Sequence, residues 1–167
     1  MTSATPSDDR GLTLVEVLIA LVVISVGLVG IAIVVPVSSE AIQQGGQLSR
    51  ATFLAEQTLE QARTAAWTSI PAVDCLGVST GAAPPAPTGP GCHGSTVSRF
   101  PDEPSVGGDP AYRRILRVAD CSATPCAGVT DAALRLVTVV VTYRTPAAAG
   151  RAPSDKAVTL EWLVARR

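Results

Sequence analysis

The chain has 167 residues, and its 13 Lys and Arg nearly balance its 14 Asp and Glu to give a net charge of −1. This balance gives no reason to expect a protein that binds nucleic acid or another acidic polymer. A hydrophobic fraction of 47% with only 16% charged residues excludes a disordered charged tail.

The first predicted element is an apolar helix. Residues 17–35 read VLIALVVISVGLVGIAIVV, and Ser25 carries the only polar side chain among them. A helix of this length spans about 28 Å, close to the ~30 Å hydrocarbon core of a bilayer. A cleavable secretory signal is the alternative, but its apolar region is usually about 7–15 residues long and ends at a small-residue cleavage site. We therefore expect a membrane helix that the mature protein retains.

The charges that flank this helix indicate its orientation. Arg10 precedes the apolar segment, and the first basic residue after it is Arg50. Basic residues favour the cytoplasmic side of a membrane. The N-terminus is therefore predicted to lie in the cytoplasm and the C-terminal part outside it.

Glu16 is the unusual residue at the start of the apolar helix. A charged glutamate at bilayer depth costs about 2.5–3.5 kcal/mol, and less near the interface. It needs a cationic partner, but the nearest one in sequence, Arg10, lies on a different helical face. The alternative is that Glu16 reaches the headgroups or only supports the first helical turn against the helix dipole.

Residues 11–16, GLTLVE, together with the apolar helix resemble the processing motif of type IV prepilins and type II secretion pseudopilins. The resemblance implies that a membrane peptidase removes a leader of residues 1–11 by cleaving between Gly11 and Leu12, and then methylates the amino group of Leu12. It also implies that Glu16 pairs with the methylated amine of a neighbouring subunit during assembly. Residues 12–37 would then form the transmembrane and assembly helix.

This segment departs from the family pattern at three places, one of which is Pro36, a little further along the chain than the kink proline of the major pilins. Leu12 follows the cleavage site where Phe is usual, and the leader carries Asp8 and Asp9 against Arg10 although such leaders are usually basic.

A second helical pattern covers residues 38–67, a polar segment in which apolar residues recur at spacings of three and four. Pro36 and Gly45-Gly46 are expected to break or soften the chain between the two helical patterns. An ordinary surface helix is one interpretation, and the resemblance implies one long helix instead. Residues 54–63 are similar to the soluble helix of PilV-class minor pilins and I-type minor pseudopilins. The predicted buried stripe is Leu48, Ala51, Ala55, Leu59, Ala62 and Ala66.

The next region, residues 68–110, is predicted to be an irregular loop. Residues 71–110 contain eight of the thirteen prolines and seven of the fourteen glycines. Such a composition disfavours regular structure.

From residue 111 onward the apolar pattern has a period of two, which predicts strands at 112–119, 134–144 and 156–165. The economical arrangement is an antiparallel meander of three strands in residues 111–167, with the helical stripe covering its apolar face. The predicted fold class is therefore α+β: a long N-terminal helix packed on a C-terminal antiparallel sheet, which is also the pilin-like architecture that the resemblance implies.

The four cysteines are expected to form disulfides if their part of the chain lies outside the cytoplasm. Three connectivities are possible, and sequence neighbours favour Cys75 with Cys92 and Cys121 with Cys126. Their spacing does not favour a zinc site.

The sequence carries no nucleophile–base set, phosphate loop or paired carboxylates at a meaningful spacing, so we expect no enzyme, no cofactor and no metal. We expect a minor pilin-like subunit of a type IV pilus. Two alternatives stay open: a minor pseudopilin of a type II secretion system or competence pilus, and a single-span anchored envelope domain in which the GLTLVE motif is fortuitous.

The resemblance also implies the partners and the location of the protein. Its partners would be other pilins or pseudopilins bound through their N-terminal helices, the prepilin peptidase and the inner-membrane assembly platform, with nucleic acid not expected. The protein would be a single-pass inner-membrane protein that later enters a pilus or pseudopilus.

Overall fold

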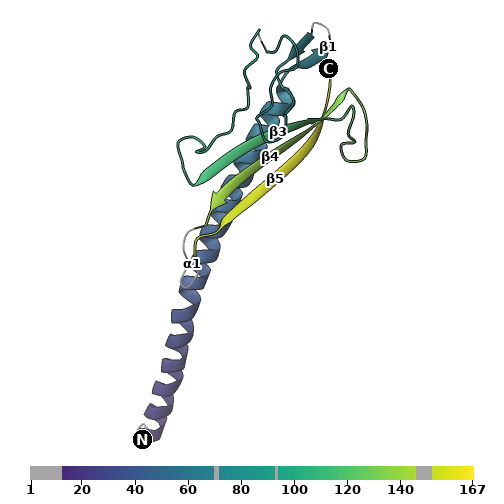
Figure 1. Cartoon of the computed structure of the whole chain (residues 1–167). Coiled ribbons are helices and arrows are strands. Elements are labelled where there is room, and N and C mark those ends of the chain that lie inside the picture. Colours follow the sequence, from purple (N-terminus) through teal and green to yellow (C-terminus); the bar gives the residue numbers. More distant parts are fainter. Residues whose placement is uncertain (1–12, 70–71, 93, 146–151) are drawn as a thin grey trace, which may run out of the picture. The chain divides into compact units, whose positions relative to one another are not determined.

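The computed structural model describes residues 13–69, 72–92, 94–145 and 152–167. The chain divides into two compact units, an N-terminal unit of residues 1–43 and a C-terminal unit of residues 44–167. One helix precedes two antiparallel sheets, so the predicted α+β class is confirmed (Figure 1). The elements are α1 (Leu14–Thr64), β1 (Trp67–Ser69), β2 (Ala72–Asp74), β3 (Tyr112–Asp120), β4 (Leu134–Arg144) and β5 (Asp155–Ala165).

Helix α1 continues without interruption through Pro36 and Gly45-Gly46, so the expected break between two helices is wrong. Glycine in a helix costs only about 1 kcal/mol relative to alanine. The cost is therefore too small to end a helix whose neighbours all favour it. At its other end α1 stops at Thr64 instead of residue 67, because Trp67 begins strand β1.

The C-terminal unit is built on the antiparallel sheet β3-β4-β5, in which Tyr112 lies opposite Tyr143 and Arg144 opposite Asp155. Along β4 the side chains alternate between buried and half-buried, and Val137, Val139 and Val141 are fully buried. The predicted strand 134–144 therefore has its predicted bounds and its predicted buried face. β3 extends one residue beyond the prediction, to Asp120, and β5 begins one residue before it, at Asp155.

The C-terminal part of α1, together with Ala65 just after its end, contributes small side chains to the same core. The buried positions are Ala51, Ala55, Thr58, Ala62 and Ala65, at alternating spacings of four and three. This corrects the predicted stripe, since Leu48 is about half exposed and Ala66 is exposed. The Thr58 hydroxyl donates to the Leu54 carbonyl oxygen at 3.0 Å, so its burial leaves no unpaired polar atom. The alanines among these buried positions belong to the same buried cluster as Val137, Val139 and Val141 of β4.

The region predicted to be irregular also contains regular pairing. Strands β1 and β2 form a two-stranded antiparallel sheet with Trp67 opposite Asp74, which the Pro- and Gly-rich composition did not indicate. Further along, the loop bonds to the outer edge of β3, where the Ser79 amide donates to the Val118 carbonyl at 2.8 Å and Glu103 bridges Arg114. The prediction of an irregular loop is therefore wrong for the segment that forms β1 and β2, and among the described residues no helix or strand lies between β2 and β3.

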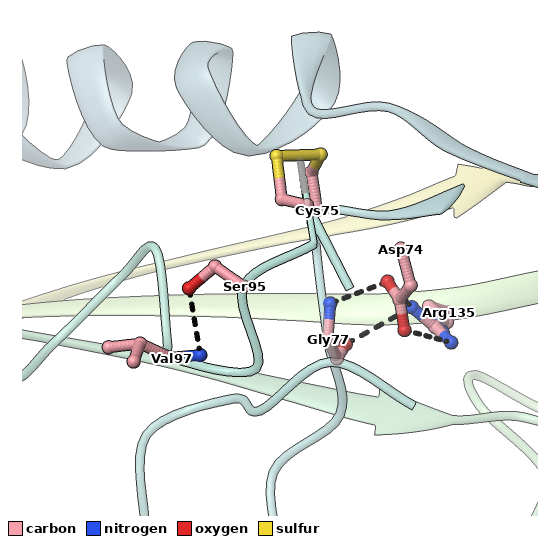
Figure 2. The surroundings of a disulfide bond; sticks show 7 residues. Asp74, Cys75, Gly77, Ser95, Val97 and Arg135 are labelled. Carbon is pink, nitrogen blue, oxygen red and sulfur yellow. Dashed lines mark hydrogen bonds and ion pairs between the residues drawn. A yellow bond between two sulfur atoms is a disulfide. The ribbon is translucent and has the colours of Figure 1, made fainter. Parts of the chain in front are cut away.

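Two disulfides, Cys75–Cys92 and Cys121–Cys126, lie in the C-terminal unit. These are the two pairings that the short sequence separations favour. The first lies next to a buried ion pair between Asp74 and Arg135 (Figure 2).

Candidate assembly site

The first turn of α1 places Glu16 beside the positive end of the helix. The Glu16 amide donates to the Thr13 carbonyl at 3.1 Å and lies 3.3 Å from the Thr13 hydroxyl oxygen, which caps the helix. A threonine followed three residues later by a glutamate has the spacing of a capping box, in which the acid also supports the N-terminus. This spacing is a local signal in the sequence, and it suits Glu16 to a capping role beside the dipole effect expected of it.

Glu16 lies within a surface that is otherwise apolar. Among the described residues, α1 is the one helix long and apolar enough to cross a membrane, and its candidate span is Leu14–Ala32. All side chains of this span are exposed in the monomer. In the part of the chain that the structure describes, no cation pairs with the Glu16 carboxylate.

The polar group in the middle of the span is satisfied within the helix. The Ser25 hydroxyl donates to the Leu21 carbonyl oxygen at 2.7 Å. Because this hydroxyl already has an acceptor, Ser25 adds little cost in an apolar surrounding. Glu16 is therefore the group of this span for which α1 itself provides no counter-charge.

Small residues share the helical face of Glu16. Ala20, Val23, Gly27 and Gly30 follow Glu16 at alternating spacings of four and three, so they lie on one face of α1. A Cβ added at Gly27 or Gly30 would meet no heavy atom of the described structure within 4 Å. Small residues on one face allow the backbone of a second helix to approach closely in a membrane.

The other predicted site residues lie elsewhere. Gly11 and Leu12, the predicted processing site, lie outside the described residues. All four cysteines are in disulfides of the C-terminal unit. They stabilise that unit, whereas Glu16 belongs to the N-terminal unit.

The C-terminal unit contains one buried polar cluster that no sequence motif predicts. The Arg135 guanidinium donates to both carboxylate oxygens of Asp74, at 2.7 and 3.2 Å, and the two side chains are only 5% and 6% exposed. The Asp74 carboxylate also accepts from the Gly77 amide at 2.8 Å (Figure 2). It accepts further hydrogen bonds from the amide and the hydroxyl of Thr88. The Trp67 ring lies 4.1 Å from the guanidinium.

This cluster also determines the titration of Asp74. Burial alone raises the pKa of the carboxyl, but the hydrogen bonds from Arg135, Thr88 and Gly77 together lower its pKa from 3.8 to about 2. Arg135 shares the period-two face of Val137, so the strand pattern already placed it inward. No local pattern indicates its partner, which lies 61 residues away along the chain.

Comparison with known proteins bears on the N-terminal segment. Residues 6–32 match the family model described as the prokaryotic N-terminal methylation motif. Searches of curated proteins and of solved structures find no match to the chain.

The matched range contains Gly11, Leu12 and Glu16, and it indicates a type IV pilin- or pseudopilin-like precursor that prepilin peptidase cleaves. The motif and the apolar helix together fit a membrane-anchored, pilus-associated protein.

Proposed function

We propose that this protein is a minor pilin-like structural subunit of a type IV pilus, assembled through α1. Prepilin peptidase cleaves it between Gly11 and Leu12 and methylates Leu12. The observation that carries the proposal is Glu16: an exposed carboxylate in the first turn of α1, and the one charged side chain of the described candidate span Leu14–Ala32. A monomer gains little from a charge at this position, whereas an assembly of such helices supplies it with a partner.

The partner is the amino terminus of an adjacent subunit. Leu12 and Glu16 are one helical turn apart, so a small axial offset between two parallel helices brings the amine of one beside the acid of the other. In a helical bundle with little water, leaving one member of such a pair unmatched costs about 3–5 kcal/mol. This penalty favours docking in which each Glu16 meets a neighbouring Leu12 amine.

The face that carries Glu16 also suits helix packing. Gly27 and Gly30 leave open space on that face, so a neighbouring helix can come close enough for van der Waals contact along its length. The C-terminal unit then lies on the oxidising side of the membrane, where its two disulfides are stable.

Two alternatives differ in where the subunit is used. A minor pseudopilin of a type II secretion system or competence pilus would have the same processing and the same α1, and neighbouring genes distinguish it from a pilus subunit. A single-span envelope anchor is a different class, in which neither cleavage nor filament entry occurs.

The N-terminus of the mature protein tests the proposal directly. Mass spectrometry of protein purified from membranes is expected to give a chain that begins with N-methylated Leu12. A chain that retains Met1 would contradict the proposal and would favour the envelope anchor.

Gly11→Val provides the matched variant for this experiment. A branched side chain before the scissile bond blocks the close backbone approach that glycine allows. We expect the variant to stay uncut in the membrane, with the mass of the full precursor. A normal mature mass from this variant would show that Gly11 does not define the cleavage site.

A further inference from the structure

Strand β5 is an edge of the sheet and has one side open. The strand order is β3-β4-β5 (Figure 1, β5 in yellow). The opposite edge, on β3, is covered by the loop that bonds to Val118 and Arg114. Within residues 155–165, by contrast, no backbone group bonds to any described residue outside β4. A strand edge of this kind can pair with another chain.

Two hydrogen bonds determine which peptide groups of β5 face outward. Just before the strand, the Thr145 amide donates to the Ser154 carbonyl at 3.0 Å, and just after it the Arg166 amide donates to the Ala133 carbonyl at 2.8 Å. Hydrogen-bonded and non-bonded pairs alternate in an antiparallel ladder. The even-numbered residues of β5 therefore bond to β4. The residues with outward N–H and C=O groups are Ala157, Thr159, Glu161, Leu163 and Ala165.

The next outward group along the chain is already in use in this way. The Arg167 amide donates to the Trp67 carbonyl at 3.0 Å, in the same alternation. This bond shows that a peptide group facing away from β4 can hydrogen-bond to another backbone segment. It also marks the C-terminal end of the part of the β5 edge that is open.

The usual protection of an edge strand is weak here. β5 is 11 residues long, its register against β4 is continuous, and its sequence contains no proline. Its charged residues are Asp155, Lys156 and Glu161. Natural edges are commonly shortened, bulged or interrupted by proline to prevent pairing. A long, regular edge without these features is suited to receiving a strand.

A groove beside the edge indicates the chemistry of the partner. It has a volume of about 230 Å³ and is lined by Arg63 and by the consecutive residues 162–167. The Arg63 guanidinium lies 4.7 Å from the ring centre of Trp162, which is 47% exposed. Three of the described lining residues are arginines and none is acidic. Arg63 already pairs with Glu60, whereas no ion pair among the described residues involves Arg166 or Arg167. Trp and Arg are the residue types enriched at interface hot spots.

We propose that the free edge of β5 receives an extended acidic segment of a partner protein as an added strand. The outward peptide groups of β5 supply main-chain hydrogen bonds, and the arginines at its C-terminal end select acidic side chains. Trp162 provides the apolar contact. This surface belongs to the C-terminal unit and does not depend on Glu16.

A tethered strand tests the proposal without requiring the natural partner. An alternating valine–glutamate segment is fused after Arg167 of the full chain through a flexible glycine–serine linker, which gives it an effective concentration on the order of mM. The measurement is residue-resolved amide hydrogen exchange in detergent micelles. We expect exchange at Thr159, Glu161 and Leu163 to slow by about tenfold or more. The matched control replaces every glutamate of the fused segment by lysine and is expected to give no slowing.

Variants of β5 and of the groove complete the test. Thr159→Pro removes one outward N–H without removing a bond to β4, and Thr159→Val keeps that N–H. The slowing at Leu163 should be lost in Thr159→Pro and kept in Thr159→Val, while both variants form the two disulfides. Arg63→Glu combined with Arg166→Glu should abolish the slowing with the acidic segment. The proposal is overturned if neither tether protects these amides, or if the acidic and the basic tether protect them equally.

Discussion

At the scale of single residues, Glu16 can act in two ways. As the third residue after the cap Thr13, it can support its own helix, and as a carboxylate on an apolar face it can pair with another subunit. Helix support needs only a hydrogen-bond acceptor, whereas pairing with an amine needs a charge. A substitution that removes the charge and keeps the acceptor therefore distinguishes the two.

We predict that Glu16→Ala and Glu16→Gln are both inserted and cleaved at Gly11, yet both enter filaments poorly. Glutamine fills the capping-box position as glutamate does, but it cannot pair with a methylated amine as a charged group. Filament counts and crosslinking to partner subunits measure the effect. If Glu16→Gln assembles like the wild type while Glu16→Ala does not, Glu16 acts through its helix cap alone.

The buried pair Asp74–Arg135 leads to a prediction on stability and pH. Asp74→Asn leaves Arg135 buried without its counter-charge, so we expect a loss of about 3–5 kcal/mol in the free energy of unfolding at neutral pH. The pKa of Asp74 is lowered on folding, from 3.8 to about 2. Its contribution to stability is therefore complete above about pH 4 and lost as the pH falls toward 2.

Urea unfolding of the wild type and of Asp74→Asn at several pH values checks this prediction. The difference between the two should shrink as the pH is lowered from about 4 to about 2. Asp155→Asn, at an exposed position at the start of β5, is the matched control and should leave the stability nearly unchanged. A difference that is constant with pH would contradict the lowered pKa of Asp74.

At the scale of elements, the contact between α1 and the sheet depends on small side chains. Ala51, Ala55 and Ala62 are fully buried, and the Arg114 side chain donates to the Leu54 carbonyl at 3.3 Å. Directly before Ala51 in the same helix, the Arg50 guanidinium pairs with the Asp109 carboxylate at 3.2 Å. Alanine side chains therefore form the centre of the contact between α1 and the sheet, and arginine side chains lie at its edge.

We predict that Ala55→Leu destabilises the C-terminal unit by about 1–3 kcal/mol, because the added methyl groups overpack a filled core. The midpoint of urea unfolding, followed by the fluorescence of Trp67 and Trp162, measures the loss. Gln57→Leu places the same leucine side chain at an exposed position of the same helix and should change the midpoint little. Equal midpoints for the two variants would mean that α1 does not pack tightly at Ala55.

At the scale of the whole molecule, the stability of the C-terminal unit depends on the compartment that contains it, because two disulfides cross-link this unit. Cys75–Cys92 closes a separation of 17 residues and Cys121–Cys126 one of 5. In the chain-entropy model these loops contribute about 3 and about 2 kcal/mol. The C-terminal unit is therefore expected to reach its full stability only in an oxidising compartment.

We predict that protein exported to the periplasm contains both disulfides, while protein retained in the reducing cytosol contains neither. Thiol counting under denaturing conditions, with and without reductant, measures this. Exported protein should show no free thiols before reduction and four after it. Four free thiols in exported material would contradict the prediction.

The structural features that depend on a local pattern of residues could be predicted from the amino-acid sequence alone. Three such features are the apolar segment after Glu16, the period of two in β4 and the short spacing of each cysteine pair. Each is a property of neighbouring residues, so it does not depend on how the rest of the chain folds. The motif at Gly11 and Leu12 is equally local, although these two residues lie outside the described structure.

Contacts between residues that are far apart in the sequence could be found only from the tertiary structure. The inward direction of the Arg135 side chain follows from strand alternation. Its pairing with Asp74 does not, because the two residues are 61 positions apart and only the folded chain brings them together. The strands β1 and β2 are too short to leave a periodic signal, and they exist because residues 67–69 pair with residues 72–74. The strand order β3-β4-β5 is that of the predicted meander, but only the fold shows which edge stays open, because the loop that covers β3 pairs residues far apart in the chain, such as Ser79 and Val118.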